Sequence, residues 1–256
     1  MASAIPSVHG HITSAEAPGA RRDGSDTATV RVAQGEATGS PWLELSVVDF
    51  APGRCADRPT DHRETVLFFV HGEGTLVAGG TEHPVEPQAG ALIPAHSTWA
   101  VEHAGPADLR VLAVAAEPAD GAADGAAAGA SAVVRLADQE ARAATGDRSF
   151  RVVVDPAVGC RSVTQFVGFV PPGRAPDHFH QYDEVIYVLA GRGVLHMDGG
   201  ATPFGAGSTI HLPPRLVHCL ENVGDDPLVV LGVFTPAGSP ADAFYPDGTR
   251  AYYDPQ

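Results

Sequence analysis

The strongest constraint on the fold of this 256-residue chain is an internal repeat. The Gly-Glu-Gly segment at 72–74 aligns with Gly-Arg-Gly at 191–193, an offset of 119 residues, and Pro94 aligns with Pro213 at the same offset. In both halves these segments follow apolar, β-branched stretches that are typical of strands. A repeat of this length indicates two similar β-barrels in tandem.

The composition favours the same architecture. The chain contains 29 glycines and 22 prolines, so turns are frequent, and 44% of its residues are hydrophobic, which is enough to form cores. Many short strands at even spacing predict antiparallel sheets folded into double-sheet jelly rolls. We therefore expect an all-β chain with two tandem jelly-roll barrels.

Charge excludes several classes of function. All 16 basic residues are arginine, and the absence of lysine excludes Schiff-base chemistry and a P-loop. The 31 acidic residues give a formal net charge of −15, which repels nucleic acid and anionic membranes. The expected partner is a small-molecule substrate, with a homodimer as a further expectation.

The cysteines indicate a reducing compartment. Cys55, Cys160 and Cys219 form no CxxC pair and are odd in number, so we expect free, buried thiols. The first residues lack a basic segment followed by an apolar core, and no apolar run reaches the length of a membrane span. These features predict a cytoplasmic protein.

Four candidate metal ligands lie in the second half. His178 and His180 are two residues apart, so on an extended strand both side chains point to one face. Glu184 keeps that parity if the strand continues, and His218 enters a later apolar strand. The four residues predict one metal site.

These residues resemble the two sequence motifs of the cupin family. The first spacer is one residue shorter than the usual cupin pattern, and Arg215 stands where most cupins have glycine. Neither departure affects a ligand. The first motif is matched by Gly173, His178, His180, Glu184 and Gly191, and the second by Gly207, Pro213, His218 and Asn222.

The resemblance implies two cupin barrels and one divalent transition-metal ion with a coordination position left for substrate. The ion could be Fe, Mn, Ni, Zn or Cu. A redox-active ion implies an oxygenase of the dioxygenase type, which is our first hypothesis. The second is a non-redox hydrolase, decarboxylase or isomerase. Ureidoglycine aminohydrolase is one such bicupin, but only His180 agrees clearly with its ligand set. The third is a cupin that binds a small molecule without turnover.

The same parity predicts the surroundings of the metal. Ile186, Val188 and Leu220 are expected to form an apolar pocket wall, and Glu184 is expected to act as a catalytic base as well as a ligand. Three arginines at turns near the barrel rim are candidates to bind a substrate carboxylate. They are Arg174, Arg192 and Arg215.

The first half lacks this ligand set. At an offset of 119 the four ligands correspond to Pro59, Asp61, Thr65 and Trp99, and at an offset of 120 the first three correspond to Arg58, Thr60 and Glu64. We therefore expect a metal-free barrel filled by Trp99 and its neighbours.

An alternative is a second metal held by His62, Glu64 and His96.

Composition also suggests where the domains end. An Ala/Gly/Asp-rich stretch predicts a flexible linker, the stretch 137–145 a short helix, and the aromatic C-terminal tail a segment that folds back on a barrel or a partner subunit. The expected divisions are a flexible tail at 1–26, an N-terminal cupin without metal ligands at 27–114, the linker at 115–133, a metal-binding cupin at 134–238 and a C-terminal tail at 239–256.

Overall fold

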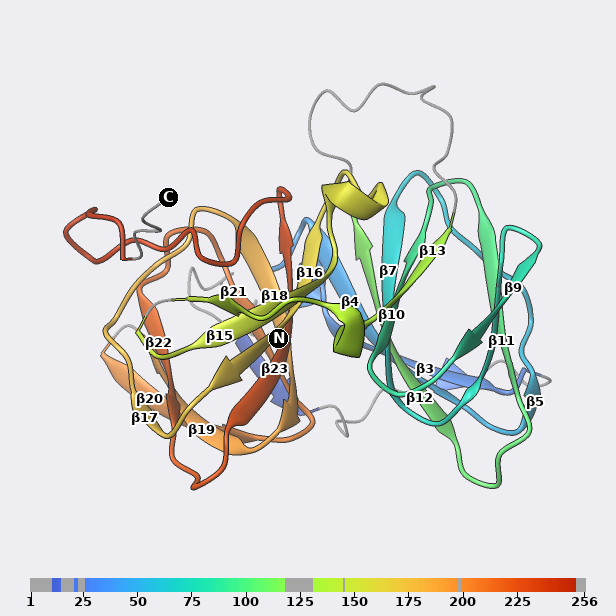
Figure 1. The fold of residues 1–256 in the computed structure, drawn as a ribbon, viewed down its shortest axis with the longest axis horizontal. Helices are drawn as coiled ribbons and strands as arrows, with labels where there is room; N and C mark the ends of the chain where they lie inside the picture. Colours follow the sequence, from blue (N-terminus) through green and yellow to red (C-terminus); the bar gives the residue numbers. More distant parts are fainter. Residues whose placement is uncertain are drawn as a thin grey trace, which may run out of the picture.

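The computed structural model describes residues 11–14, 21–22, 26–117, 131–144, 146–197 and 199–251, and it consists of two β-barrels side by side (Figure 1). The elements of the first half are β1 (His11–Ser14), β2 (Arg21–Arg22), β3 (Ala28–Gln34), η1 (Glu36–Thr38), β4 (Leu43–Phe50), β5 (Gly53–Arg54), β6 (Arg58–Pro59), β7 (Glu64–His71), β8 (Gly74–Ala78), β9 (Thr81–Val85), β10 (Ala89–Ile93), β11 (Thr98–His103) and β12 (Leu109–Ala116).

The elements of the second half follow a similar order. These elements are β13 (Ala132–Arg135), η2 (Leu136–Asp138), β14 (Arg142–Ala143), β15 (Ser149–Val154), η3 (Pro156–Val158), β16 (Thr164–Val170), β17 (Gly173–Arg174), β18 (Asp183–Ala190), β19 (Arg192–Met197), β20 (Gly200–Gly205), β21 (Ser208–Leu212), β22 (His218–Asn222) and β23 (Leu228–Thr235).

Each barrel consists of one large and one small antiparallel sheet. The first barrel has a seven-stranded sheet, β13-β10-β7-β12-β4-β3-β2, and a five-stranded sheet, β5-β11-β8-β9 with β6 on β11. The second has a seven-stranded sheet, β1-β21-β18-β23-β16-β15-β14, and a four-stranded sheet, β17-β22-β19-β20. The predicted all-β fold with two jelly-roll barrels is confirmed.

The barrels exchange their outermost strands, which changes the predicted boundaries. Strand β1, within the segment expected to be a flexible tail, pairs with β21 of the second barrel, where His11 lies opposite His211. Strand β13 pairs with β10 of the first barrel, although its last residues were assigned to the second domain. Both large sheets thereby gain an edge strand from the other half of the sequence, and most of the expected linker lies outside the described residues.

The stretch 137–145 does not form the predicted helix. A single 3-10 turn, η2, is followed by β14, which pairs with β15. A helix of fewer than a dozen residues is marginal in water, and strand pairing satisfies these backbone groups instead. Within the described residues, no helix is long and apolar enough to cross a membrane.

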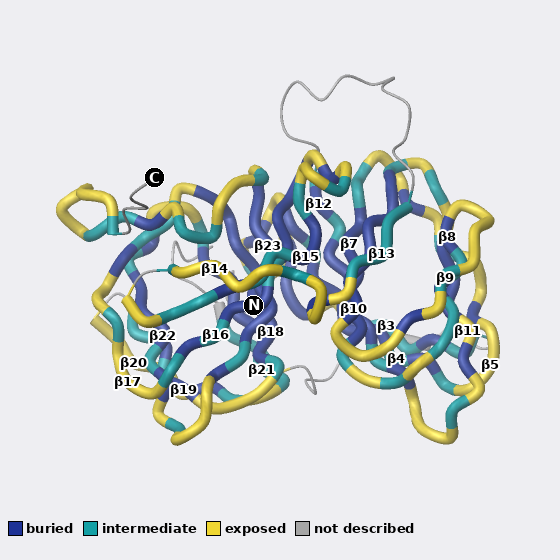
Figure 2. Tube along the Cα trace, in the orientation of Figure 1, coloured by how far each residue is buried: buried dark blue, intermediate teal, exposed yellow. Residues whose placement is uncertain are grey.

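Strand alternation separates three cores. On β18, Val185 and Tyr187 face the first barrel and join a cluster shared by both large sheets, whereas Ile186 and Val188 face the interior of the second barrel. Figure 2 shows buried stretches gathered where the two barrels meet. The three cysteines are buried and free, as expected.

Candidate metal centre

Three of the predicted ligands come together inside the second barrel. The backbone N–H of His178 donates to the carbonyl of His218 at 3.0 Å, and the N–H of His218 donates back at 2.8 Å. This bridge sets the two imidazoles side by side, with ring centroids 4.7 Å apart. His180 lies two residues along the same extended segment, and one nitrogen from each of the three rings lies within 4.8 Å of the others.

A tight turn holds this arrangement. The N–H of Arg215 donates to the carbonyl of His180 at 2.7 Å, and the N–H of Leu216 closes a turn on Pro213. Arg215 has a φ of 66°, in the left-handed region that favours glycine, which explains why glycine is usual at this position in cupins. The turn directs β22 so that His218 enters the barrel.

The hydrogen bonds fix the tautomer of each imidazole. Nδ1 of His178 lies 3.1 Å from the carbonyl of Pro176, that of His180 lies 3.0 Å from the carbonyl of Asp242, and that of His218 lies 2.9 Å from the carbonyl of Leu216. A carbonyl oxygen only accepts, so each Nδ1 must carry the proton. Each Nε2 therefore keeps its lone pair, as metal ligation requires.

Burial keeps the three rings uncharged. It lowers the pKa of His178 to about 4, and burial together with His178 lowers the pKa of His180 to about 3. The pKa of His218 also lies well below its usual value, because of burial and the two neighbouring imidazoles. At neutral pH all three lone pairs are available to an ion, so the residues present fit a divalent transition metal.

Glu184, the fourth predicted ligand, lies in the wall of the same cavity but outside this group of nitrogens. Its side chain is buried, and its Oε1 lies next to Gly232, where a larger residue would collide with it. Burial, with a smaller effect of Asp183, raises the pKa of the Glu184 carboxyl to about 8. The structure therefore places a largely neutral carboxylic acid beside the three imidazoles at pH 7.

The cavity next to the imidazoles has a volume of about 90 Å³ and walls that are mostly apolar. Two of the predicted wall residues, Ile186 and Leu220, line it, and Val188 lies in the surrounding core rather than at the cavity surface. The other apolar lining residues are Ala144, Phe150, Phe166, Phe169, Val170, Val230, Pro240 and Ala243.

The three arginines singled out at turns do not line this cavity. Arg174 is exposed and pairs with Asp177 at 2.8 Å, Arg215 lies over the ring of Phe179, and Arg192 is also exposed. The arginine at the cavity is instead Arg148, just before β15. Arg148 lies outside both sequence motifs, so the sequence analysis did not single it out.

Two further features of the site were not predicted. Tyr182 is buried between His180 and Phe234, stacking on the imidazole with ring centroids 4.5 Å apart. Residues 239–251 fold back on the second barrel, where Phe244 pairs with Phe179 and the carbonyl of Asp242 accepts from His180. The tail was expected to fold back, but not to contact a ligand; Tyr252 and Tyr253 lie outside the described residues.

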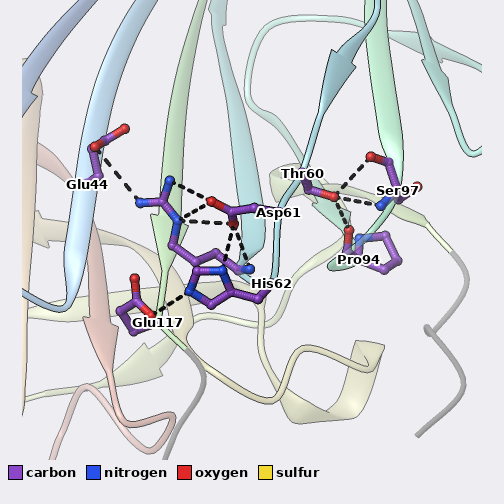
Figure 3. Close-up of polar contacts among 8 residues, drawn as sticks. Glu44, Thr60, Asp61, His62, Pro94, Ser97 and Glu117 are labelled. Atoms are coloured by element: carbon purple, nitrogen blue, oxygen red, sulfur yellow. Dashed lines mark hydrogen bonds and ion pairs between the residues drawn. The ribbon is translucent and has the colours of Figure 1, made fainter. Parts of the chain in front are cut away.

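In the first barrel, the residues of the alternative second site lie apart. Glu64 turns to the second barrel, where it accepts from the N–H groups of Arg161 and Ser162, both at 2.9 Å. Figure 3 shows His62 directed instead to Glu117, with Nε2 to Oε2 at 3.0 Å. His96 is exposed, and in the described part of the chain these three residues form no ligand group.

The centre of the first barrel contains Trp99. It is buried and packs edge-to-face on Phe50, with centroids 6.2 Å apart. Near it, Thr60 donates to the carbonyl of Pro94, and Asp61 contacts His62 (Figure 3). Asp61 and Trp99 are the residues that correspond in sequence to His180 and His218 at the offset of 119, and Asp61 is exposed whereas Trp99 is buried.

Comparisons with known proteins identify a cupin domain in this part of the chain. The cupin domain family matches residues 165–234, which contain all four predicted ligands. Two curated relatives match part of the chain: the uncharacterized protein MJ1618 of Methanocaldococcus jannaschii, 39% identical over 49 residues, and the polyketide synthase CurC of Streptomyces cyaneus, 33% identical over 79 residues. These matches cover 19% and 30% of this chain, and span 39% and 51% of the relatives' own lengths.

Solved structures match nearly the whole chain. A putative glyoxylate-induced protein from Pseudomonas aeruginosa has a TM-score of 0.73 at 18% identity, covering 88% of both chains. Protein Ylba from E. coli has a TM-score of 0.73 at 13% identity, covering 89% of this chain and 91% of its own. A mutant of Bacillus subtilis oxalate decarboxylase has a TM-score of 0.66 at 15% identity, covering 88% and 76%. The C-terminal region of the chain thus contains a cupin domain, and the chain as a whole has the cupin jelly-roll fold.

Proposed function

We propose that the second barrel is the site of a metal-dependent enzyme that acts on a small organic substrate. The observation that supports this most directly is the set of three neutral imidazoles whose Nε2 lone pairs converge. His178, His180 and His218 would hold one divalent ion, with Glu184 as the fourth ligand. The first barrel, filled by Trp99, serves as a scaffold without a metal.

Our first candidate reaction is an oxygenation of the dioxygenase type. His178, His180 and His218 would hold a redox-active ion, which would supply the electrons that activate dioxygen. The chain contributes a cavity beside the imidazoles with apolar walls, which include Phe166, Ile186 and Leu220. These walls would hold the body of an organic substrate.

Glu184 is the group that would move a proton. Its carboxyl is largely neutral at pH 7 because it is buried, but a dication beside it favours the carboxylate. The carboxylate then accepts a proton from the substrate within the cavity, where the apolar walls limit exchange with solvent. Nδ1 of each imidazole is engaged with a backbone carbonyl, so the imidazoles are not available for this step.

A non-redox reaction, a decarboxylation in particular, is the second candidate. This reaction needs a proton donor for the carbanion left by loss of CO₂, and Glu184, after taking the proton of the substrate's carboxyl group, would return it within the same cavity. One structural neighbour is named as an oxalate decarboxylase, which supports the same chemistry by likeness of fold alone.

The same cavity would also serve a cupin that binds a small molecule without turnover, and the detection of a product separates that role from either reaction.

The test is a comparison of metals under two atmospheres. Metal-free protein is loaded separately with Fe(II), Mn(II), Ni(II), Zn(II) or Cu(II), and oxygen uptake and CO₂ release are recorded with a panel of small organic acids. Oxygen uptake coupled to product formation supports the oxygenase. CO₂ release that persists without oxygen supports the decarboxylase, and no product with any metal contradicts an enzymatic role for this panel.

A further inference from the structure

Arg148 is a positive charge at the wall of the candidate site that the proposed reaction has not used. It is half-buried, and one terminal nitrogen, Nη2, donates to the carbonyl of Leu220 at 2.6 Å and contacts the thiol of Cys219 at 3.8 Å. Leu220 lies two residues beyond His218 on β22, and both line the cavity. Arg148 is therefore fixed to the strand that carries a ligand.

Among the described residues, no carboxylate forms an ion pair with Arg148, whereas Arg174 pairs with Asp177 and Arg110 pairs with Asp49 at 2.7 Å. Arg151 is also half-buried and donates to the carbonyl of Leu136, but it does not line the cavity. Arg148 therefore combines two features: it lines the cavity, and it has no carboxylate partner in the described part of the chain.

The charge of Arg148 lies at the same cavity as the three imidazoles. Among the described residues that line this cavity, Arg148 is the only arginine, and His178, His180 and His218 line it as well. Although the chain carries a net charge of −15, this cavity therefore has a fixed positive charge in its wall.

We propose that Arg148 binds the carboxylate group of the substrate, so that the substrate is a small organic acid with an apolar body. This inference rests on the proposed function, since it concerns the same cavity. Guanidinium and carboxylate form strong charge-assisted hydrogen bonds. The apolar lining, which includes Phe150 and Phe169, suits the body of the acid, and the volume of about 90 Å³ limits its size. Arg148 then positions the acid beside the imidazoles.

The experiment uses the metal-free full-length protein with acetate as the probe and acetamide as its neutral isostere. Binding is measured at pH 7 by calorimetry and by changes in the NMR signals of the cavity methyl groups. We expect wild-type protein to bind acetate at least tenfold more tightly than acetamide, and Arg148→Gln to lose this preference. Arg148→Lys, which keeps the charge without the planar guanidinium, should retain part of it. Arg142→Gln, at an exposed arginine on β14, is the matched control and should bind as wild type does.

Three outcomes overturn the proposal: equal binding of acetate and acetamide by wild type, no binding of acetate, or an unchanged preference in Arg148→Gln. If Arg148 only fastens β22, both substitutions lower the melting temperature and leave the preference intact. If Arg148→Gln does not fold, the proposal is still tested by two measurements: the preference of wild type for acetate over acetamide, and the part of that preference that Arg148→Lys retains. The binding experiment contains no metal, so its result does not depend on whether turnover is found. If acetate binding does not depend on Arg148, the proposal for Arg148 is wrong, while the metal site and its chemistry are still tested by the metal-loading experiment.

Discussion

Replacing Glu184 by glutamine should change how the stability of the metal-free protein depends on pH. The Glu184 carboxyl is buried, and its pKa in the folded protein is about 8, against 4.5 for an ordinary glutamate. Between these values the unfolded chain carries the carboxylate while the folded chain carries the acid. Folding therefore takes up a proton, and stability falls as pH rises towards 8.

The size of the effect is taken from the difference between the two proteins. Unfolded imidazoles still carry part of their protons at about pH 6.5, but His178, His180 and His218 are present in both proteins, so their effect cancels in this difference. From about pH 6.5 to about 8, one proton at about 1.36 kcal/mol per pH unit gives a loss of about 2 kcal/mol in the free energy of unfolding. The amide introduced by Glu184→Gln cannot ionise, so the variant lacks this loss.

The assay is urea denaturation of chelator-treated wild type and Glu184→Gln at several pH values across the same range. A constant difference between the two proteins is acceptable, because the amide packs differently from the acid. The difference must change by about 2 kcal/mol across the range in favour of the variant. Parallel curves would show that Glu184 is already ionised in the folded protein, and the electrostatic account of the cavity would be wrong.

Three further predictions use the same proteins. Metal at a thousandfold excess over its Kd should stabilise the fold by about 4 kcal/mol, so chelation should lower the melting temperature, and superimposed melting curves would contradict a native metal site. Glu64→Ala removes the acceptor of two backbone N–H groups between the barrels, so the free energy of unfolding measured with urea should fall by about 2 kcal/mol. The variant should keep its metal, and loss of metal would instead support the alternative site that includes Glu64. Glu184→Gln should lower turnover per bound metal at least about a hundredfold, and near wild-type turnover would mean that Glu184 is only a ligand.

Local pattern predicted much of the fold and the centre of the site. The alternation on β18 directs Val185 and Tyr187 toward the other barrel and places Ile186, one of the predicted wall residues, at the cavity. The two-residue spacing of His178 and His180 predicted one shared face, and in the structure the two rings lie close together. Such features depend only on the period of a strand, which neighbouring residues reveal.

What could not be predicted depends on contacts between distant segments. Arg148 reaches the cavity because β15 follows it and its side chain is held by β22, a pairing that no local pattern marks. Strands β1 and β13 are four residues long, and each joins a sheet of the other half, where partner strands rather than their own residues determine the pairing. Glu184 has the predicted parity, yet its position against Gly232 follows from packing in the barrel interior.

Metal stoichiometry tests the central claim most directly. Elemental analysis of protein purified without added metal and then loaded with Mn(II), with excess metal removed, should give one ion per chain. His180→Ala removes one of three converging imidazoles, so its occupancy should fall at least tenfold, while Glu64→Ala should still bind one ion. Two ions per chain, or a His180→Ala variant that retains its metal, would contradict a single centre built on these histidines.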